Sequence, residues 1–384
     1  MIPYSTQTIL NSDIKGVNKV LKSKWLTQGP LVKKFELRLS KVVKSKYAVA
    51  VNSGTSALHV SCLALGLKPR DILWTVPNTF VASANCGLLA GSKVDFVDIN
   101  KNSFNIDTNL LKKKLIQAKK KNKLPKILVT VHFAGQPPEQ DIIWQLSKKF
   151  KFKILEDASH ALGSFYKKEP VGSCKWSHIT VFSFHPVKTI TTCEGGAATT
   201  NNLELYDRLR IFSNHGITKE KKFFKSKTKN AWHYEQQELG LNYRMSEVSA
   251  SLGLTQLKNL NKFVKSRNKI AKLYYKNLKE DFIQLPKISK FCISSFHLFV
   301  IRIIGQSEEY HRKFFNFLRE KKINVNVHYM PVHLQPYYKR LGFKKNSFKN
   351  SERHATSSIS IPIFPSIKKK DIFKIIKLIN NYSN

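Results

Sequence analysis

The sequence predicts an α/β protein with a large domain on a mostly parallel sheet and a smaller α+β C-terminal domain. Short apolar runs alternate with segments of helical spacing, which is typical of strand–helix–strand units. The chain has 384 residues, of which 42% are hydrophobic, enough for a sizeable core and two domains. We expect the large domain at residues 1–250, and the connecting helix with the small domain at 251–384.

The first elements alternate between helix and strand. The spacing predicts a helix over 32–43, a strand over 47–51 and a helix over 55–65 that Gly66 would end. Further buried strands are expected at 72–75, 94–97, 127–131, 154–155 and 179–184. The segment 79–90 has helical spacing and is rich in small residues, so we expect it to pack closely against a neighbour.

The remainder of the chain predicts a change of architecture. One long helix is expected over 245–278, and it would carry the chain out of the first domain. A strand-like stretch at 297–303, a helix over 308–323 and a closing helix over 369–382 follow it. These elements together predict the smaller α+β domain.

The charge of the chain is unusual. It contains 66 Lys and Arg residues against 25 Asp and Glu, a formal net charge of +41. Such an excess is typical of nucleic-acid-binding proteins. The lysines are spread over the whole length and no nucleic-acid motif accompanies them, so we interpret the charge as compositional bias and expect no nucleic-acid partner. An attraction for an anionic substrate that carries phosphates is the alternative.

Several features favour a cytoplasmic protein without a membrane partner. No apolar run approaches the roughly 20 residues that span a bilayer, and the first ten residues lack the pattern of a signal peptide. The five cysteines are dispersed without CxxC spacing, which favours reduced thiols over disulfides or a metal site. They are Cys62, Cys86, Cys174, Cys193 and Cys292.

Polar residues gather where predicted strands end, which is where ligands collect in parallel α/β folds. Gly54, Thr55 and Ser56 open a predicted helix, so free N–H groups and hydroxyls could bind a phosphate there. A structural N-cap explains the same residues equally well. Asp157 follows a buried strand, where an acid requires a cation or a strong donor unless it is a surface acid or a helix cap.

Lys188 stands alone in 183–197, a segment whose other basic residue is His185. Lysine is usually a solvated charge, but one in such a place can lose its proton and attack an aldehyde. Ser183 would supply a further phosphate donor. The guanidinium of Arg244 can donate two parallel hydrogen bonds to a carboxylate or phosphate, or else it forms a structural salt bridge. Hydroxyls, a strand-end acid and a lone lysine are the components of a pyridoxal-phosphate enzyme.

Five stretches, in order and over nearly the full chain, resemble the DegT/DnrJ/EryC1/StrS family of sugar-nucleotide aminotransferases. They are NSGTSALH, VPNTFVASAN, EDASHALGS, SFHPVKTITTCEGGA and GLNYRMSEVSASLGL. Within this family, His160 and the stretches KSKWLTQGP, SFHPVKTITT and NVHYMPV resemble the branch that acts in pseudaminic-acid biosynthesis. The implied reaction moves an amino group from L-glutamate to the C4 keto group of a UDP-linked 4-keto-6-deoxy-N-acetylhexosamine.

The resemblance implies fold type I, the aspartate aminotransferase-like fold, and pyridoxal 5′-phosphate, with pyridoxamine 5′-phosphate in the half-reaction. Lys188 would form the Schiff base and transfer protons, and Asp157 would keep the ring nitrogen protonated. Phe80 would lie against the ring and His160 near its phenolic oxygen, where many relatives carry glutamine. The residues implied at or beside the cofactor phosphate are Gly54, Thr55, Ser56 and Ser183.

A homodimer with shared sites is also implied, with Asn242 reaching across from the second subunit. The residues implied to bind the sugar nucleotide are Tyr4, Lys24, Trp25, Leu26, Thr27, Gly54, Ser183, Asn242, Arg244, Asn326, Val327, His328 and Tyr329. Ordinary packing of Trp25 and a structural role for His328 are the alternatives at those positions. Cys193 departs from the family, whose members commonly carry glycine there.

Lys188 itself separates the transaminases from the related sugar dehydratases, which have histidine at that position. A sister aminotransferase for another nucleotide-linked 3- or 4-keto-sugar is the nearest alternative, because small changes of a pocket decide the substrate. A basic nucleic-acid-binding protein and a non-catalytic scaffold are alternatives from other classes.

Overall fold

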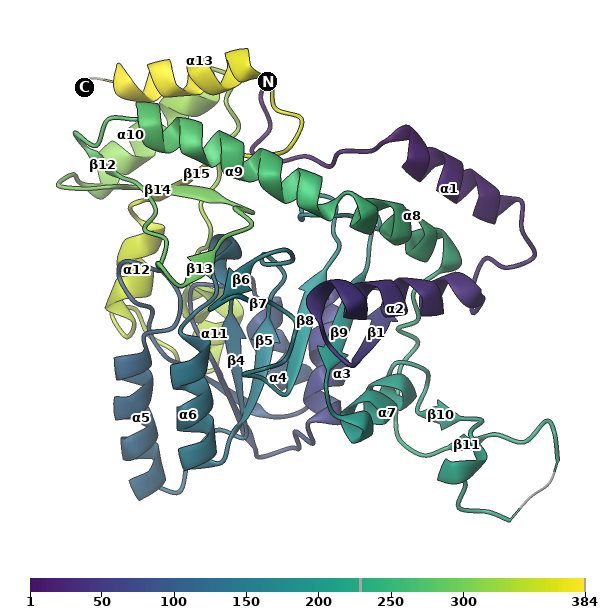
Figure 1. Cartoon of the computed structure of the whole chain (residues 1–384). Coiled ribbons are helices and arrows are strands. Elements are labelled where there is room, and N and C mark those ends of the chain that lie inside the picture. Colours follow the sequence, from purple (N-terminus) through teal and green to yellow (C-terminus); the bar gives the residue numbers. More distant parts are fainter. Residues whose placement is uncertain (228–229, 383–384) are drawn as a thin grey trace.

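A seven-stranded sheet forms the centre of the larger part of the molecule in the computed structural model, which describes residues 1–227 and 230–382 (Figure 1). The strand order is β1 (Tyr47–Val51), β9 (Gly196–Thr200), β8 (Ile179–Ser183), β5 (Lys153–Asp157), β4 (Ile127–Val131), β2 (Ile72–Thr75) and β3 (Lys93–Phe96). Only β9 among these strands runs antiparallel to its neighbours, β1 and β8. The predicted mostly parallel sheet is confirmed.

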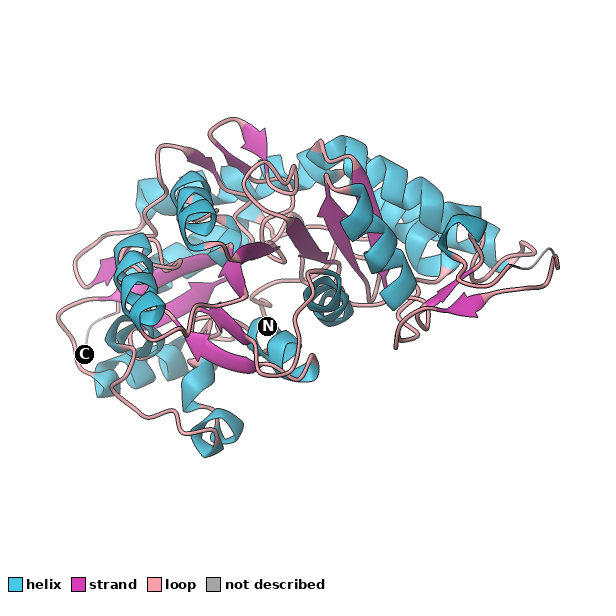
Figure 2. Ribbon diagram, turned by 90° about the horizontal axis from the view of Figure 1, so that it is seen from below, coloured by secondary structure: helices cyan, strands magenta, loops and turns pink. Residues whose placement is uncertain are grey.

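Helices cover both faces of this sheet, as Figure 2 shows from below. One face packs against α3 (Gly54–Ala64), α4 (Ala82–Leu89) and α7 (Leu203–Phe212). The other packs against α2 (Pro30–Val43), α5 (Thr108–Lys120) and α6 (Gln140–Phe150). In β1, Val49 and Val51 face the first layer while Ala48 and Ala50 face the second, because side chains alternate along a strand.

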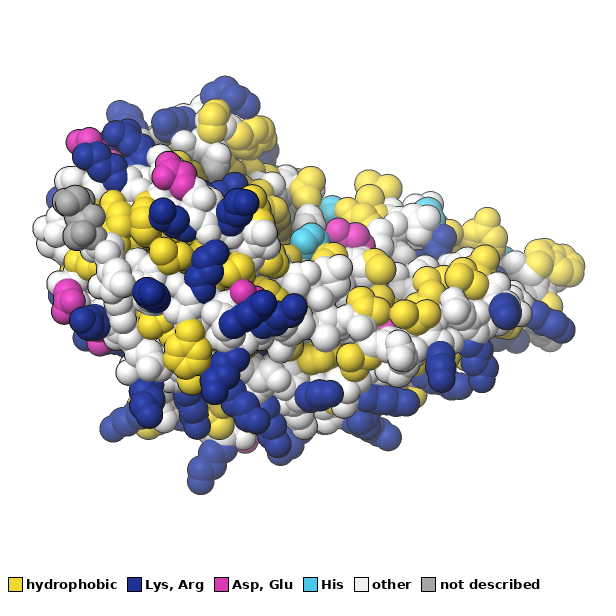
Figure 3. Space-filling model, turned by 90° about the horizontal axis from the view of Figure 1, so that it is seen from above, with side chains coloured by type: hydrophobic (Ala, Val, Ile, Leu, Met, Phe, Trp, Pro, Cys, Tyr) yellow, Lys and Arg dark blue, Asp and Glu magenta, His cyan; other side chains and the backbone are white. Residues whose placement is uncertain are grey.

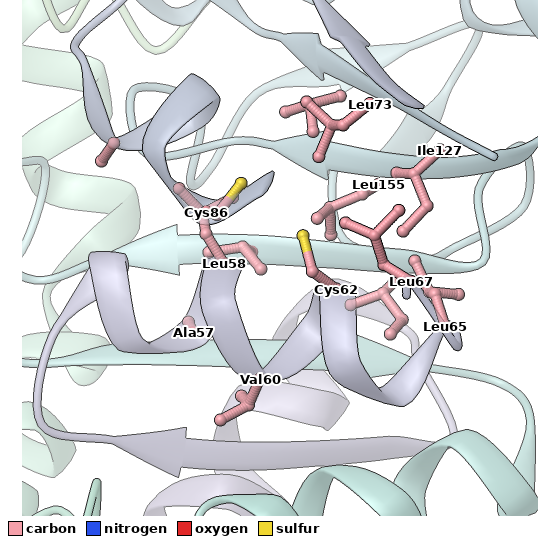
Figure 4. Packing of buried hydrophobic residues seen from close by; sticks show 14 of the residues in the cluster. Ala57, Leu58, Val60, Cys62, Leu65, Leu67, Leu73, Cys86, Ile127 and Leu155 are labelled. Carbon is pink, nitrogen blue, oxygen red and sulfur yellow. The ribbon is translucent and has the colours of Figure 1, made fainter. Parts of the chain in front are cut away.

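The core between α3, α4 and the sheet is tightly packed (Figure 4). Cys62 of α3 and Cys86 of α4 are buried here beside Leu73 and Leu155. A Cβ atom at Gly87 would come within 3.1 Å of the Leu73 side chain, so glycine lets α4 pack on β2 without a shift of Leu73. The close packing predicted for the small residues of this segment is therefore observed.

The smaller part has its own core. The antiparallel sheet β12 (Ile283–Gln284), β14 (Phe299–Ile303) and β15 (Ser358–Ile361) packs against three amphipathic helices. These helices are α9 (Leu260–Asn277), α10 (Glu308–Glu320) and α13 (Lys369–Asn380). The short helix α11 (Pro336–Arg340) packs through Tyr338 against the core of the larger part, and α12 (Lys349–Ala355) follows it in the chain.

The remaining elements are short or peripheral. They are α1 (Asn11–Leu21), the three-stranded sheet of β7 (Glu169–Pro170), β6 (Phe165–Tyr166) and β13 (Cys292–Ile293), and the hairpin of β10 (Ile217–Thr218) and β11 (Glu235–Gln236). The hairpin extends away from the body of the molecule (Figure 1, Figure 2).

The prediction of one long helix over 245–278 is wrong. The segment forms α8 (Glu247–Lys258) and α9, with a break at Asn259, whose side-chain amide donates to the Thr255 carbonyl at 3.1 Å. Helix α8 packs on α1 and α2, whereas α9 packs on α13. The predicted boundary at residue 250 lies inside α8, and residues 383–384 of the predicted small domain lie outside the described residues.

The N-terminal segment crosses to the smaller part before the chain enters α1. Ile2 forms a parallel bridge with Ile323, and the Ile363 N–H donates to the carbonyl oxygen of Tyr4 at 3.1 Å. Tyr4 is thereby held against the smaller part. The next residue, Ser5, contacts the larger part, because its hydroxyl donates to the carbonyl of Val187, which is 182 positions later in the chain. The two parts are connected through this segment as well as through α8 and α9.

Lysine and arginine side chains are distributed over the face that Figure 3 shows, between apolar and uncharged side chains. Many of them lie on the left part and along the lower edge of this view, and the interpretation of the charge as compositional bias stays a prediction. Within the described residues, no helix is both long enough and apolar enough to span a membrane.

Candidate active site

A cavity of about 600 Å³ opens at the carboxyl ends of the parallel strands. Asp157 ends β5, Ser183 ends β8 and Val131 ends β4, and all three line it. Residues 326–329 of the smaller part close the cavity from the other side. Its volume and its place in the fold are typical of sites for small molecules in α/β proteins.

Most of the predicted site residues line this one cavity although they are far apart in the sequence. They are Tyr4, Gly54, Thr55, Phe80, Asp157, His160, Ser183, Lys188, Asn326, Val327, His328 and Tyr329. The fold therefore brings the predicted cofactor residues and the predicted residues of the small domain into a single site. The role of each residue stays a prediction.

Lys188 lies in the loop between β8 and β9 with its side chain partly buried. The loop is closed by backbone hydrogen bonds, including those from the Phe184 N–H to the Gly195 carbonyl at 2.8 Å and from the Lys188 N–H to the His185 carbonyl at 2.9 Å. Burial lowers the pKa of the Lys188 amine to about 8, against the opposing charge of Asp157. An appreciable fraction of this amine is therefore neutral and nucleophilic near neutral pH.

Asp157 is buried, and hydrogen bonds hold both of its carboxylate oxygens. Oδ2 accepts a hydrogen bond of 2.6 Å from the Ser83 hydroxyl. Oδ1 accepts from the Ser159 hydroxyl at 2.6 Å and from the Ser159 N–H at 3.1 Å. A carboxylate fixed in this way at the cavity wall can keep a protonated ring nitrogen charged.

The first turn of α3 forms the part of the wall that suits a phosphate. Gly54 and Thr55 line the cavity, whereas the Ser53 side chain caps the helix by accepting from the Ser56 N–H at 3.0 Å. Ser56 does not line the cavity, and its hydroxyl donates to Asn52 Oδ1 at 2.6 Å. In this turn Ser53 therefore caps the helix, whereas Gly54 and Thr55 are the residues placed to bind a phosphate.

Gly54 allows this turn to approach the end of β8 closely. A Cβ atom at position 54 would lie 2.9 Å from Cβ of Ser183, which is closer than real Cβ contacts. The helix N-terminus and the Ser183 side chain thus form one cradle for an anion. With Lys188 and Asp157 in the same cavity, the residues present fit the aldehyde, the ring nitrogen and the phosphate of pyridoxal phosphate.

His160 and Tyr329 bring the two parts of the molecule together in the cavity wall. Nε2 of His160 lies 3.0 Å from the Tyr329 hydroxyl oxygen, and Nδ1 accepts from the Ala134 N–H at 3.3 Å. The His297 ring packs on the His160 ring with 4.2 Å between centroids. Burial and the charge of Lys188 hold the pKa of His160 well below its usual range, so the ring is neutral.

Nδ1 of His328 lies 2.8 Å from the Ser360 hydroxyl, so His328 has a structural partner as well as a place in the cavity wall.

Several residues of this site were not predicted from the sequence. Thr79 lines the cavity and Ser83 holds Asp157; both belong to VPNTFVASAN, so that motif was a usable signal. His297 precedes β14 in the smaller part, and nothing in its sequence surroundings indicates the cavity. The other lining residues that were missed are Ser53, Leu58, Ala82, Val131, Ser159, His185, Val187 and Glu194.

The remaining predicted residues lie elsewhere on the chain. Lys24, Trp25, Leu26, Thr27 and Asn242 are exposed and do not line the cavity. Arg244 lines a separate cavity of about 500 Å³ and donates to Asn214 Oδ1 at 2.7 Å, so its described partner is an amide rather than a carboxylate. Thr27 forms an antiparallel bridge with Ser246, the residue that caps α8, so Thr27 lies beside the start of α8.

Comparisons with known proteins agree with this site. The model of the DegT/DnrJ/EryC1/StrS aminotransferase family matches residues 7–380. The UDP-4-amino-4,6-dideoxy-N-acetyl-beta-L-altrosamine transaminase of Campylobacter jejuni is 40% identical over 372 residues, covering 97% of this chain and 94% of the relative.

Solved structures give the same result. Helicobacter pylori PseC, an aminotransferase of pseudaminic acid biosynthesis, is 31% identical with a TM-score of 0.89, covering 98% of each chain. The putative sugar aminotransferase Spr1654 of Streptococcus pneumoniae, in its pyridoxamine-phosphate form, is 29% identical with a TM-score of 0.90, covering 99% of this chain and 98% of that one.

Proposed function

Because the chain belongs to the DegT/DnrJ/EryC1/StrS aminotransferase family, we propose that it aminates a UDP-linked 4-keto-6-deoxy-N-acetylhexosamine at C4 with L-glutamate as the donor. The chain is a pyridoxal-phosphate-dependent sugar aminotransferase. The proposed product is UDP-4-amino-4,6-dideoxy-N-acetyl-β-L-altrosamine, which the name of the Campylobacter jejuni relative supports. Lys188 and Asp157 in one cavity with the Gly54–Ser183 cradle carry the proposal.

When bound, pyridoxal phosphate supplies an aldehyde for the amino group and a protonated ring that withdraws electrons from the reacting carbon. Asp157, held by Ser83 and Ser159, keeps the charge of the ring nitrogen in place. The Lys188 amine acts as the base that removes the Cα proton of glutamate, and its conjugate acid delivers a proton to C4 of the sugar. Glutamate leaves as 2-oxoglutarate with uptake of one water, and the keto oxygen of the sugar leaves as water.

We further propose that two chains form a homodimer with shared sites. Asn242 and the segment of Lys24–Thr27 lie outside the cavity of their own chain and are exposed. Several large apolar side chains in the same N-terminal region are also exposed, namely Ile14, Leu21, Trp25, Leu26 and Leu37. A partner surface that covered them would bury apolar area and could bring Asn242 to the second site.

The direct test is to trap the cofactor. The protein is loaded with pyridoxal phosphate, reduced with borohydride and digested, and the modified peptide is identified by mass spectrometry. We expect a visible absorbance band before reduction and a label on Lys188, with both absent in Lys188→Ala. A Lys188→Ala variant that turned over and kept the band would refute the assignment.

The substrate is tested separately with a panel of nucleotide-linked keto-sugars and glutamate. We expect the UDP-linked 4-keto-6-deoxy-N-acetylhexosamine to give the highest kcat/KM, and the amine to appear at C4 by NMR of the product. A preference for a 3-keto or a GDP-linked sugar would contradict the proposed substrate while leaving the aminotransferase chemistry intact.

A further inference from the structure

Tyr329 makes one side-chain hydrogen bond to a described residue, and its partner is His160. The two side chains come from different parts of the molecule, and both line the cavity of about 600 Å³. Either atom of such a pair can be the donor, so the role of the phenol depends on which ring nitrogen of His160 carries hydrogen.

The backbone of Ala134 decides the position of that hydrogen. Its N–H donates to Nδ1 of His160 at 3.3 Å, and a backbone amide nitrogen cannot accept in return. Nδ1 must therefore present a lone pair, and a neutral imidazole with a bare Nδ1 carries its hydrogen on Nε2. It follows that Nε2–H of His160 donates to the Tyr329 oxygen at 3.0 Å.

Neighbouring residues keep both rings in this arrangement. The His297 ring packs on His160, and the Ser295 hydroxyl donates to the His160 carbonyl at 2.8 Å. A flip of the His160 ring would exchange Nδ1 for a carbon and leave the Ala134 N–H without its acceptor. Tyr329 is held by its own N–H, which donates to Asn78 Oδ1 at 3.1 Å.

The phenolic hydrogen of Tyr329 is therefore free for a ligand in the cavity. Its oxygen already accepts from His160, and no described residue accepts its hydrogen. Burial and the negative charge of Asp157 raise the pKa of Tyr329 above its usual range, so the phenol keeps this hydrogen at neutral pH.

We propose that Tyr329 is a catalytic residue that donates its phenolic hydrogen to the keto oxygen of the sugar substrate. This inference rests on the proposed function. A neutral donor suits a neutral carbonyl oxygen, whereas the carboxylates of glutamate favour cationic partners. Apart from Lys188, no lysine or arginine of the described residues lines the cavity. A hydrogen bond to the keto oxygen polarises C4 toward the incoming amine.

The arrangement of hydrogens can be measured without turnover. The full chain, carrying ¹⁵N-labelled histidine, is compared by long-range ¹H–¹⁵N NMR with His160→Gln, which identifies the signals of His160. We expect a neutral ring protonated at Nε2 and bare at Nδ1. A ring protonated at Nδ1, or a charged ring at pH 7.5, would overturn the inference.

The role toward the sugar is tested with Tyr329→Phe in separated half-reactions, followed by absorbance in single turnovers. The pyridoxal-phosphate form is mixed with glutamate, and the pyridoxamine-phosphate form with the UDP-linked 4-keto-sugar. We expect the sugar half-reaction to slow by about 10- to 100-fold and the glutamate half-reaction to change by less than about twofold.

Tyr275→Phe is the matched control, because the Tyr275 hydroxyl donates to the Pro286 carbonyl at 2.6 Å and does not line the cavity. Equal losses in both half-reactions of Tyr329→Phe would overturn the inference. So would a changed absorbance spectrum of the bound cofactor with normal sugar kinetics, because the phenol would then serve the cofactor. If the wild-type chain were inactive in both half-reactions, that result would instead contradict the proposed function itself.

Discussion

The Ser83 hydroxyl donates a hydrogen bond of 2.6 Å to Oδ2 of Asp157, although the two residues are 74 positions apart in the chain. Thr79 Oγ1 lies 2.7 Å from the Ser83 hydroxyl, so the first turn of α4 and the loop before it position the acid that ends β5. The carboxylate is therefore oriented by a neighbouring segment as well as by its own strand.

Replacing Ser83 by alanine tests this positioning. The change removes a hydrogen bond to a charged group, which typically contributes about 1.5–3 kcal/mol. We expect the apo-protein to bind pyridoxal phosphate at least about tenfold more weakly, as measured by absorbance titration. Ser61→Ala is the control, because Ser61 is equally buried but donates to the Ala57 carbonyl within α3. Equal effects of the two changes would indicate a general loss of stability.

The pKa of Lys188, lowered to about 8, predicts a pH profile for cofactor capture by the apo-protein. The neutral amine is the nucleophile, so the rate of pyridoxal-phosphate incorporation should rise as the pH passes through about 8 and then level off. Stopped-flow absorbance gives this profile. A midpoint near the ordinary lysine value of 10.5 would contradict it.

The same shift has a consequence for folding. Between pH 8 and 10.5 the folded apo-protein has released this proton while the unfolded chain still holds it. The contribution of Lys188 to stability therefore becomes more favourable as the pH rises through that window. Urea unfolding of the wild type and Lys188→Met at both ends of the window should show the difference between them changing in this direction.

Gly54→Ala should weaken binding of the cofactor phosphate, because the new Cβ would collide with Ser183. We expect a loss of at least about tenfold in affinity for pyridoxal phosphate and little change for pyridoxal, which lacks the phosphate. Ser183→Gly provides the matched background, since it removes the colliding atoms. Adding Gly54→Ala there should cost little, and an undiminished loss would show that the collision is not the cause.

Arg267 is a buried cation without a described carboxylate partner, and burial lowers its pKa to about 10. Its guanidinium donates to the carbonyls of Ile363 at 2.7 Å, His297 at 3.2 Å and Phe296 at 3.3 Å. Arg267→Met should lower the free energy of unfolding by about 3 kcal/mol, because these carbonyls lose their donor. Thermal unfolding measures this, with the exposed Arg312→Met as the control.

Shared sites predict complementation between two inactive variants. Lys188→Ala lacks the nucleophile, and Asn242→Ala lacks the residue proposed to reach the partner site. After unfolding and refolding in equal amounts, half of the dimers should be mixed and each should hold one intact site, restoring about a quarter of the wild-type activity. Sites complete within one chain would give no recovery beyond that of the separate variants.

Much of the fold could be predicted because local pattern and tertiary position agree. The predicted strands at 47–51, 72–75 and 127–131 coincide with β1, β2 and β4, whose apolar runs are buried on both faces. The fold class, the aminotransferase family and the cofactor are confirmed as well.

The missed features depend on contacts that sequence spacing does not encode. Strand β9 reads GAATT, a run of small residues that forms a strand because β1 and β8 enclose it. The break at Asn259 follows from two different packing partners for α8 and α9. His297 enters the cavity only because the smaller part folds against the larger one.

The cavity wall has two origins, and this has an evolutionary consequence. The sheet of the larger part and the loop after β8 supply Asp157, Ser183 and Lys188, whereas Tyr4 and residues 326–329 are attached to the smaller part, which has a separate core. Under the proposed function, lineages that vary Tyr4 and residues 326–328 would change the sugar site and leave the residues proposed for the chemistry in place. A library confined to Tyr4 and residues 326–328, which leaves Tyr329 in place, is accordingly the natural starting point for changing which sugar is aminated.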